Sequence, residues 1–129
     1  LIGILATENG RTGEALQNDN GTWDMGPFQV NTTHINELAG MGIAPEAVLQ
    51  DGCTNAYAAA WLLRKEYNRT GNIWQAIGSY HSRTPHRRDA YIAQVKSHLA
   101  RLLRSGIFTL PLLAPDSAPD ITPGRESGQ

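Results

Sequence analysis

Residues 20–31 read NGTWDMGPFQVN, and this stretch determines where the chain leaves helical structure for β-structure. Asn20-Gly21 is the strongest hairpin signal in the chain, because both residues tolerate the positive φ angles that a tight turn requires. The residues after this turn can supply one or two short strands. Pro27 lacks a backbone N–H donor, so any strand that contains it is short or lies at an edge. The stretch therefore predicts one small β-hairpin.

Around this hairpin the apolar residues recur at helical spacing. Leu1 to about Thr7 reads as the end of a helix, which Asn9-Gly10 stops because both residues accept a positive φ. The longest helix is predicted from Asp51 to about Tyr67. Shorter helices are predicted for residues 32–41, 45–49 and 72–79, and a last one for 87–104. The fold class is therefore mostly α (α+β), with one domain over residues 1–104 and a flexible tail rich in Pro, Ser and Gly over 105–129.

Composition and charge exclude several classes of protein. The chain has 129 residues, which suit one domain of ordinary size, and its net charge of −1 does not point to a nucleic-acid or membrane partner. Residues 83–104 are basic, but a solvated helix face is the simpler interpretation, since no aromatic residues alternate with the arginines as stacking platforms. No apolar run reaches the roughly 18 residues of a membrane-spanning helix. We expect neither nucleic acid nor a membrane span.

The first residues and the single cysteine leave a question open. The chain starts at Leu1 inside an apolar pattern, so we expect the domain to have an N-terminal part that is missing from this sequence. Cys53 is either a small buried hydrophobic residue or, if the protein is exported, the partner of a cysteine further upstream. The sequence does not decide between these alternatives.

Residues that could hold a metal or act as a nucleophile are sparse. The histidines form no HExxH pattern, and Cys53 has no CxxC partner. There is also no GxSxG motif and no phosphate-binding glycine loop. We expect no metal and no cofactor.

The carboxylates are more informative. Glu8 follows Leu1, Ile4 and Leu5 at helical spacing, so it lies on or beside the apolar stripe where the first helix ends. Asp24 stands in the predicted hairpin, and the amides of Gln29 and Asn31 follow it. A carboxylic acid in a poorly solvated place keeps its proton near neutral pH and can act as a general acid. A cleft that cleaves sugars needs such an acid beside amide groups, although a lone glutamate near a helix end is usually a surface residue.

The combination resembles the lysozyme-like superfamily and, within it, the bacterial lytic transglycosylase (SLT-type) domain. Glu8-Asn9-Gly10 is similar to the family's E-S-G turn, residues 26–29 (GPFQ) to its G-L-M-Q segment, and residues 78–82 (GSYHS) to its A-Y-N segment. Residues 21–31, Gly42-Ile43 and residues 51–55 (DGCTN) resemble segments of the small enzymes that accompany type IV secretion, conjugation and pilus systems. Pro27 and Phe28 stand where the family has Leu-Met. The resemblance covers about residues 1–100.

The resemblance implies a function. Glu8 would protonate the bond between N-acetylmuramic acid and N-acetylglucosamine in peptidoglycan, and would then take the proton of the muramic C6 hydroxyl as a 1,6-anhydro ring closes. Residues expected to bind the substrate are Gly26, Phe28, Gln29, Asn31 and Tyr80. For Tyr80, a purely structural role in the core is the alternative. The expected partners are glycan strands and components of a secretion or conjugation apparatus, in the periplasm or outside the cell.

Two other functions fit the same residues. Asp24 resembles the hairpin aspartate of animal lysozymes, so a muramidase that uses Glu8 and Asp24 for hydrolysis is one alternative. The other is a non-catalytic module that binds peptidoglycan or docks onto a secretion complex, in which Glu8 is dispensable.

Overall fold

The computed structural model describes residues 1–106, and within them the chain is mostly helical with a small antiparallel sheet. This confirms the predicted fold class. The tail predicted from residue 105 lies, from residue 107 on, outside the described residues. The helices are α1 (Ile2–Glu8), the 3-10 helix η1 (Thr32–His34), α2 (Ile35–Gly40), α3 (Pro45–Gln50), α4 (Gly52–Thr70), α5 (Ile73–His81) and α6 (Pro85–Ser105). The strands are β1 (Ala15–Gln17), β2 (Trp23–Met25) and β3 (Val30–Asn31).

The sheet has three strands in the order β1-β2-β3, one more than a hairpin needs. β1 lies in a polar segment that lacks the alternation of apolar and polar residues typical of a strand, so its sequence did not predict one. In the register, Asp24 pairs with Leu16 on one side and with Asn31 on the other. The Asn20-Gly21 turn forms as predicted, with Gly21 at φ +88°. The sheet thus carries Asp24 and Asn31 side by side.

The helix ends follow the local signals. Asn9, at φ +52°, ends α1 in the left-handed conformation, and Gly71, at φ +68°, ends α4 in the same way. Asp51 caps α4 by accepting a hydrogen bond from the Cys53 N–H. The helix predicted for 32–41 divides into η1 and α2, because Asn31 caps Thr33 and starts a tighter turn first. The last helix begins at Pro85, two residues before the predicted start, as proline suits a first helical position.

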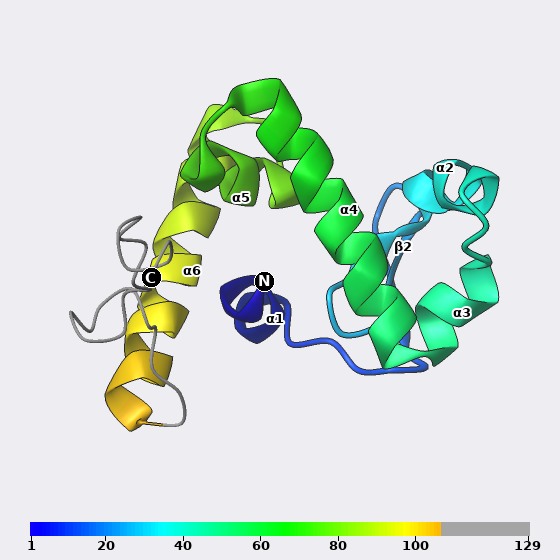
Figure 1. The fold of residues 1–129 in the computed structure, drawn as a ribbon, viewed down its shortest axis with the longest axis horizontal. Coiled ribbons are helices and arrows are strands. Elements are labelled where there is room, and N and C mark those ends of the chain that lie inside the picture. The colour runs from blue at the N-terminus through cyan, green and yellow to red at the C-terminus, as the bar shows by residue number, and fades with distance from the viewer. Residues whose placement is uncertain (107–129) are drawn as a thin grey trace, which may run out of the picture. The chain divides into compact units, whose positions relative to one another are not determined.

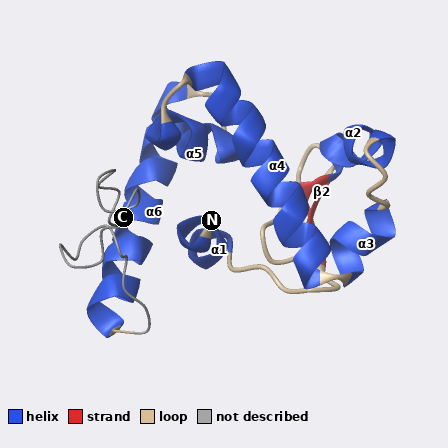
Figure 2. Ribbon diagram, viewed as in Figure 1, coloured by secondary structure: helices blue, strands red, loops and turns tan. Residues whose placement is uncertain are grey.

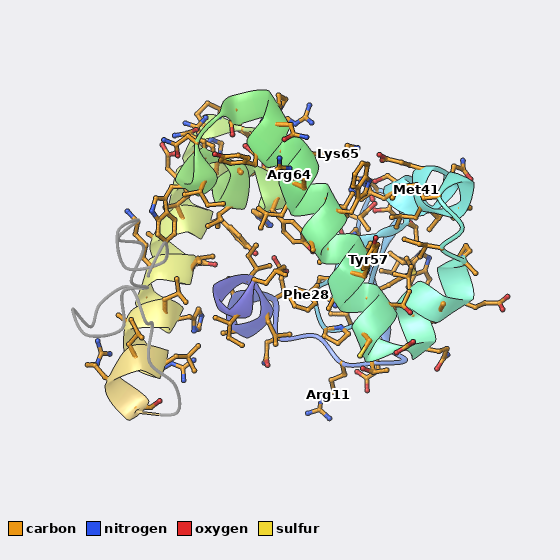
Figure 3. All side chains as sticks on the ribbon, viewed as in Figure 1. Arg11, Phe28, Met41, Tyr57, Arg64 and Lys65 are labelled. Carbon is orange, nitrogen blue, oxygen red and sulfur yellow. The ribbon has the colours of Figure 1, made fainter. Side chains whose placement is uncertain are left out.

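The core lies around α4. Figures 1 and 2 show α4 with the sheet and α3 beside one part of it and α5 beside another. α4 contacts β3, α3 and α5, which agrees with the prediction that this helix is buried on several sides. Phe28, from the β2–β3 turn, points into this core and is 6% exposed (Figure 3). The buried core residues are Ile4, Met25, Phe28, Val30, Leu38, Val48, Ala58, Ala59 and Leu62.

Candidate active site

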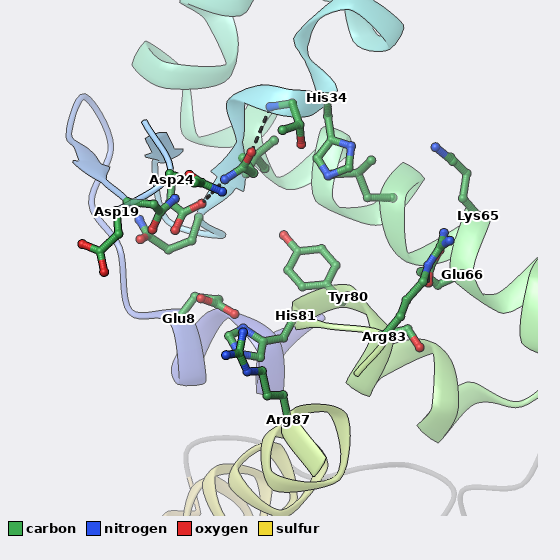
Figure 4. A pocket seen from close by; sticks show the side chains of 18 residues that line it. Glu8, Asp19, Asp24, His34, Lys65, Glu66, Tyr80, His81, Arg83 and Arg87 are labelled. Atoms are coloured by element: carbon green, nitrogen blue, oxygen red, sulfur yellow. Dashed lines mark hydrogen bonds and ion pairs between the residues drawn. The ribbon is translucent and has the colours of Figure 1, made fainter. Parts of the chain in front are cut away.

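A pocket of about 750 Å³ brings together most of the residues that the sequence singled out (Figure 4). Its walls come from the end of α1, the sheet and its turns, α4, α5 and the first turn of α6. The lining residues are Glu8, Asn18, Asp19, Asn20, Asp24, Gln29, Val30, Asn31, Thr33, His34, Leu62, Lys65, Glu66, Ser79, Tyr80, His81, Arg83 and Arg87. Its polar lining suits a ligand that is rich in hydroxyl and amide groups.

Glu8 is the half-buried acid at this pocket. Burial raises the pKa of Glu8 above its ordinary value of 4.5. A hydrogen bond from Tyr91 lowers this pKa and the negative charge of Asp24 raises it, and the net direction is upward. The carboxyl group therefore keeps its proton to higher pH than a solvated glutamate does.

Tyr91 lies behind Glu8 and determines how the carboxyl group is held. Its hydroxyl donates to Glu8 Oε2 at 2.6 Å, and its side chain is 3% exposed. The His81 ring stacks on the Tyr91 ring, with centroids 4.8 Å apart and planes inclined by 7°. Within residues 1–106, Oε1 of Glu8 has no such hydrogen-bond partner. Sequence reasoning missed Tyr91, although its place four residues before Val95 on the buried face of α6 was a usable signal.

Asp24 and Asn31 form a hydrogen-bonded pair across β2 and β3. Asn31 Nδ2 donates to Asp24 Oδ1 at 2.9 Å and to the Thr22 hydroxyl at 3.0 Å. Asn31 Oδ1 meanwhile accepts from the Thr33 N–H at 2.9 Å. These bonds orient both side chains, which line the same pocket as Glu8. Asp24 is thus placed to influence Glu8 through its charge.

Gln29 reaches the pocket from a tight turn in which both Gly26 and Gln29 have positive φ angles. Its φ is +53°, and its side-chain amide donates to the Gly26 carbonyl at 3.0 Å. Gly26 has φ +69°, and a Cβ there would collide with the amide of Asn55. Gly26 is buried beneath the pocket and is not among its lining residues. Its contribution is to let the turn pass close to α4.

Asn55 and Tyr80 form hydrogen bonds with the backbone N–H and carbonyl of Phe28, respectively. The buried Asn55 side chain accepts from the Phe28 N–H at 2.8 Å and donates to the carbonyls of Met25 and Val48, each at 2.9 Å. The Tyr80 hydroxyl donates to the Phe28 carbonyl at 2.7 Å. Burial, and then the charges of Glu8 and Asp24, raise the pKa of Tyr80 well above its ordinary value.

These contacts give different roles to Tyr80 and Phe28, two of the residues that the sequence predicts to bind the substrate. Tyr80 lines the pocket, while its hydroxyl bonds the turn rather than Glu8. The Phe28 side chain does not line the pocket, because it is packed in the core, so only its backbone supports the site.

Other predicted features lie away from this pocket. Cys53 is exposed on α4 and forms no disulfide within residues 1–106, so the buried alternative is wrong and an upstream partner stays a prediction. In the same residues no group of His, Cys, Asp and Glu has an arrangement that could hold a metal ion. None of the described helices has the length and apolar character needed to cross a membrane. Trp23 is 42% exposed and does not line the pocket.

Comparison with known protein families places most of the chain in one family. The "Transglycosylase SLT domain" family matches residues 1–101, a range that contains every residue lining the pocket. The chain belongs to the SLT transglycosylase family. This confirms the resemblance inferred from the motifs around Glu8 and Gln29.

Proteins similar to this SLT domain occur in enteric bacteria. The X polypeptide of Escherichia coli is 38% identical over 76 residues, which cover 54% of this chain and 45% of that protein. Invasion protein IagB of Salmonella typhimurium is 32% identical over 78 residues, covering 60% and 49%. Protein IpgF of Shigella flexneri is 33% identical over 85 residues, covering 65% and 56%. The chain spans about half the length of these curated relatives.

Proposed function

We propose that the chain is the catalytic domain of a peptidoglycan lytic transglycosylase in which Glu8 is the only proton carrier. The observation that carries the proposal is the position of Glu8: it is half-buried, its pKa is raised, and it opens onto the pocket that the SLT family match covers. A protonated carboxyl group in such a place has the protonation state that a general acid needs near neutral pH. Of the two glutamates that line this pocket, Glu8 has its pKa raised and Glu66 has its pKa lowered.

In the first step, Glu8 gives its proton to the oxygen that joins N-acetylmuramic acid to N-acetylglucosamine. The bond between this oxygen and the muramic C1 breaks, and the N-acetylglucosamine part leaves as an alcohol. Glu8 becomes a carboxylate, which the hydrogen bond from Tyr91 stabilises. Glu8 must therefore be protonated before the step and stable as a carboxylate after it. Burial favours the protonated form, and the hydrogen bond from Tyr91 favours the carboxylate.

In the second step, the Glu8 carboxylate takes the proton from the muramic C6 hydroxyl. The C6 oxygen forms a bond to C1, which closes the 1,6-anhydro ring and restores the acid. No water is consumed, and no second carboxylate is needed as a nucleophile. Glu8 thus returns to its starting state in each turnover.

The amide side chains would hold the sugar during both steps. Gln29 and Asn31 line the pocket and are oriented by the hydrogen bonds of their own turn and strand. Tyr80 offers an aromatic ring in the same pocket, with its hydroxyl bound to the backbone. We assign to these residues the binding of N-acetyl and hydroxyl groups, because neutral amides both donate and accept hydrogen bonds.

Hydrolysis by a muramidase mechanism is the second candidate, and Asp24 is the observation that favours it. Asp24 lines the pocket, and its charge acts on Glu8. A retaining glycosidase would use it as a nucleophile, and an inverting one would use it to activate water. Against this role, Asp24 Oδ1 already accepts a hydrogen bond from Asn31. The products separate the two mechanisms, because hydrolysis adds one water molecule that ring closure does not.

Digestion of purified cell walls tests the proposal. The wild-type chain is expected to release fragments with 1,6-anhydro ends, identified by mass spectrometry, and Glu8→Gln is expected to release none while its circular dichroism stays unchanged. Asp24→Asn should still produce anhydro ends. Reducing ends from the wild type would establish the hydrolase instead. Equal turnover by Glu8→Gln would exclude Glu8 as the acid and favour a non-catalytic module.

The substrate also implies where the protein acts. Peptidoglycan lies outside the cytoplasmic membrane, so we place the activity in the periplasm or beyond. Local opening of the wall for a secretion, conjugation or pilus apparatus is the expected use, and the name of the relative IagB, an invasion protein, agrees with it.

A further inference from the structure

A cluster of charged residues at one wall of the pocket contains more positive charges than negative ones. Glu66 is 7% exposed and lies between two guanidinium groups. Arg83 donates from Nε to Oε1 at 3.0 Å and from Nη2 to Oε2 at 2.8 Å. Arg69 donates to Oε1 at 2.9 Å. A single carboxylate between two arginines leaves one positive charge without a counterion.

Arg83 is the member of this cluster that reaches the pocket. The two hydrogen bonds to Glu66 fix the plane of its guanidinium group, while the side chain remains 64% exposed. Its Nη1 donates to no residue within the range 1–106. The group is therefore oriented in advance and keeps N–H donors for an anionic ligand.

Arg87 adds a second cation at the same pocket. Its exposed side chain has no hydrogen bond or ion pair with any residue in the part of the chain that the structure describes. It stands in the first turn of α6, where the helix dipole disfavours a positive charge. Its neighbour Arg88 is paired with Asp89 at 3.0 Å. An anion bound in the pocket would offset this unfavourable position of Arg87.

Two other basic groups of the pocket, Lys65 and His34, do not add to this excess. Lys65 is paired with Glu37 at 2.7 Å. Burial, and then the charge of Lys65, hold the pKa of His34 below 6.5, so this ring is mostly neutral at pH 7. Figure 4 shows Asp19 and Asp24 on one side of the pocket, with Arg83 on the other side and Arg87 at its edge. The pocket is thus acidic on one side and basic on the other.

We propose that Arg83 and Arg87 form a subsite for carboxylates, and that it takes the acidic peptide attached to the muramic sugar of the substrate. This inference rests on the proposed function for the identity of the sugar. The peptide carries several carboxylates, which guanidinium groups bind with two parallel hydrogen bonds. The chain would therefore prefer glycan that bears peptides over bare glycan.

The distribution of charge favours such a ligand over a continuous polyanion. A nucleic acid or an anionic lipid surface would bring negative charge next to Asp19 and Asp24 as well as next to the arginines. A muropeptide has uncharged sugar rings for the acidic side of the pocket and carboxylates on its branch. Only a ligand that is charged in one part matches both walls.

Equilibrium binding, measured by calorimetry, tests this subsite without requiring turnover. The chain carries Glu8→Gln throughout, and the ligands are a peptide-bearing tetrasaccharide, the same compound with its peptide carboxylates amidated, and the peptide-free tetrasaccharide. We expect Arg87→Gln to weaken binding of the first ligand about tenfold, the size of one charge-assisted hydrogen bond. Binding of the amidated ligand should change less than about twofold. Arg87→Lys, which keeps the charge, should recover part of the loss.

Arg64→Gln is the matched control, because it removes the same charge from an exposed position on α4 outside the pocket (Figure 3). It should leave all affinities unchanged. The proposal is overturned if Arg87→Gln changes no affinity, if it weakens the amidated ligand equally, or if it weakens the peptide-free ligand equally, which would place the lactyl carboxylate at the subsite. Failure of the wild type to digest cell walls while the peptide preference persists would refute the transglycosylase and leave the subsite intact.

Discussion

Replacing Asn55 by alanine tests how the floor of the pocket is held. Asn55 is completely buried and makes hydrogen bonds to the Phe28 N–H and to the carbonyls of Met25 and Val48. These bonds join the turn that carries Gln29 to α3 and α4. Truncation removes all of them and leaves buried backbone groups without their partner. At about 1 to 1.5 kcal/mol for each bond, the free energy of unfolding should fall by about 3 to 4.5 kcal/mol.

Urea denaturation followed by tryptophan fluorescence measures this loss. A change of this size is a large part of the 5–15 kcal/mol or so that stabilises a typical domain, so the midpoint should move clearly while the slope stays constant. Asn68→Ala is the matched control, because Asn68 is exposed on the same helix. It should change stability by no more than the helix preference of alanine, about 0.5 kcal/mol in favour of folding.

A small loss of stability in Asn55→Ala would refute the role assigned to the Asn55 hydrogen bonds. If Asn55→Ala loses less than about 1 kcal/mol relative to the control, water replaces the amide without cost and the three bonds do not hold the turn. If the loss is large but activity on cell walls persists at denaturant concentrations where the variant stays folded, the turn is stable and its geometry does not depend on Asn55. The expected result is loss of both stability and activity.

Three further predictions concern the carboxyl groups. Tyr91→Phe removes a hydrogen bond that lowers the pKa of Glu8, so the alkaline limb of the pH–activity profile should move to higher pH; a limb at lower pH would contradict the role of Tyr91. Asp24→Asn removes a charge that raises the same pKa, so the alkaline limb should move in the opposite direction, and no movement would mean that Asp24 does not act on Glu8. Burial raises the pKa of Glu66, but the hydrogen bonds led by Arg83 outweigh burial and hold this pKa below 4.5. The ionised form therefore stabilises the fold above that pH, and the stability advantage of the wild type over Glu66→Gln should shrink as the pH falls below about 4.5, measured by urea denaturation at each pH.

Much of the fold could be read from local patterns. Helical spacing located the helices to within a few residues, and Asn9, Gly21 and Gly71 marked turns that the structure places at positive φ. These signals work because a turn or a helix end depends on the backbone preferences of a few adjacent residues. β1 was not predicted, because a short polar strand exists only through its pairing with β2.

The site was predicted only in part, and the division has a physical reason. The sequence by itself determined that Glu8 ends a helix and that Gln29 and Asn31 follow a hairpin, because these are relations between near neighbours. Only the tertiary structure decided that Tyr91, 83 residues away, bonds Glu8 and that Phe28 turns into the core. The raised pKa of Glu8 also depends on the tertiary structure, because residues distant in the sequence exclude water from the carboxyl group and place charges near it. Spacing along the chain encodes what each element is, and packing decides which side chains meet and how strongly they act on one another.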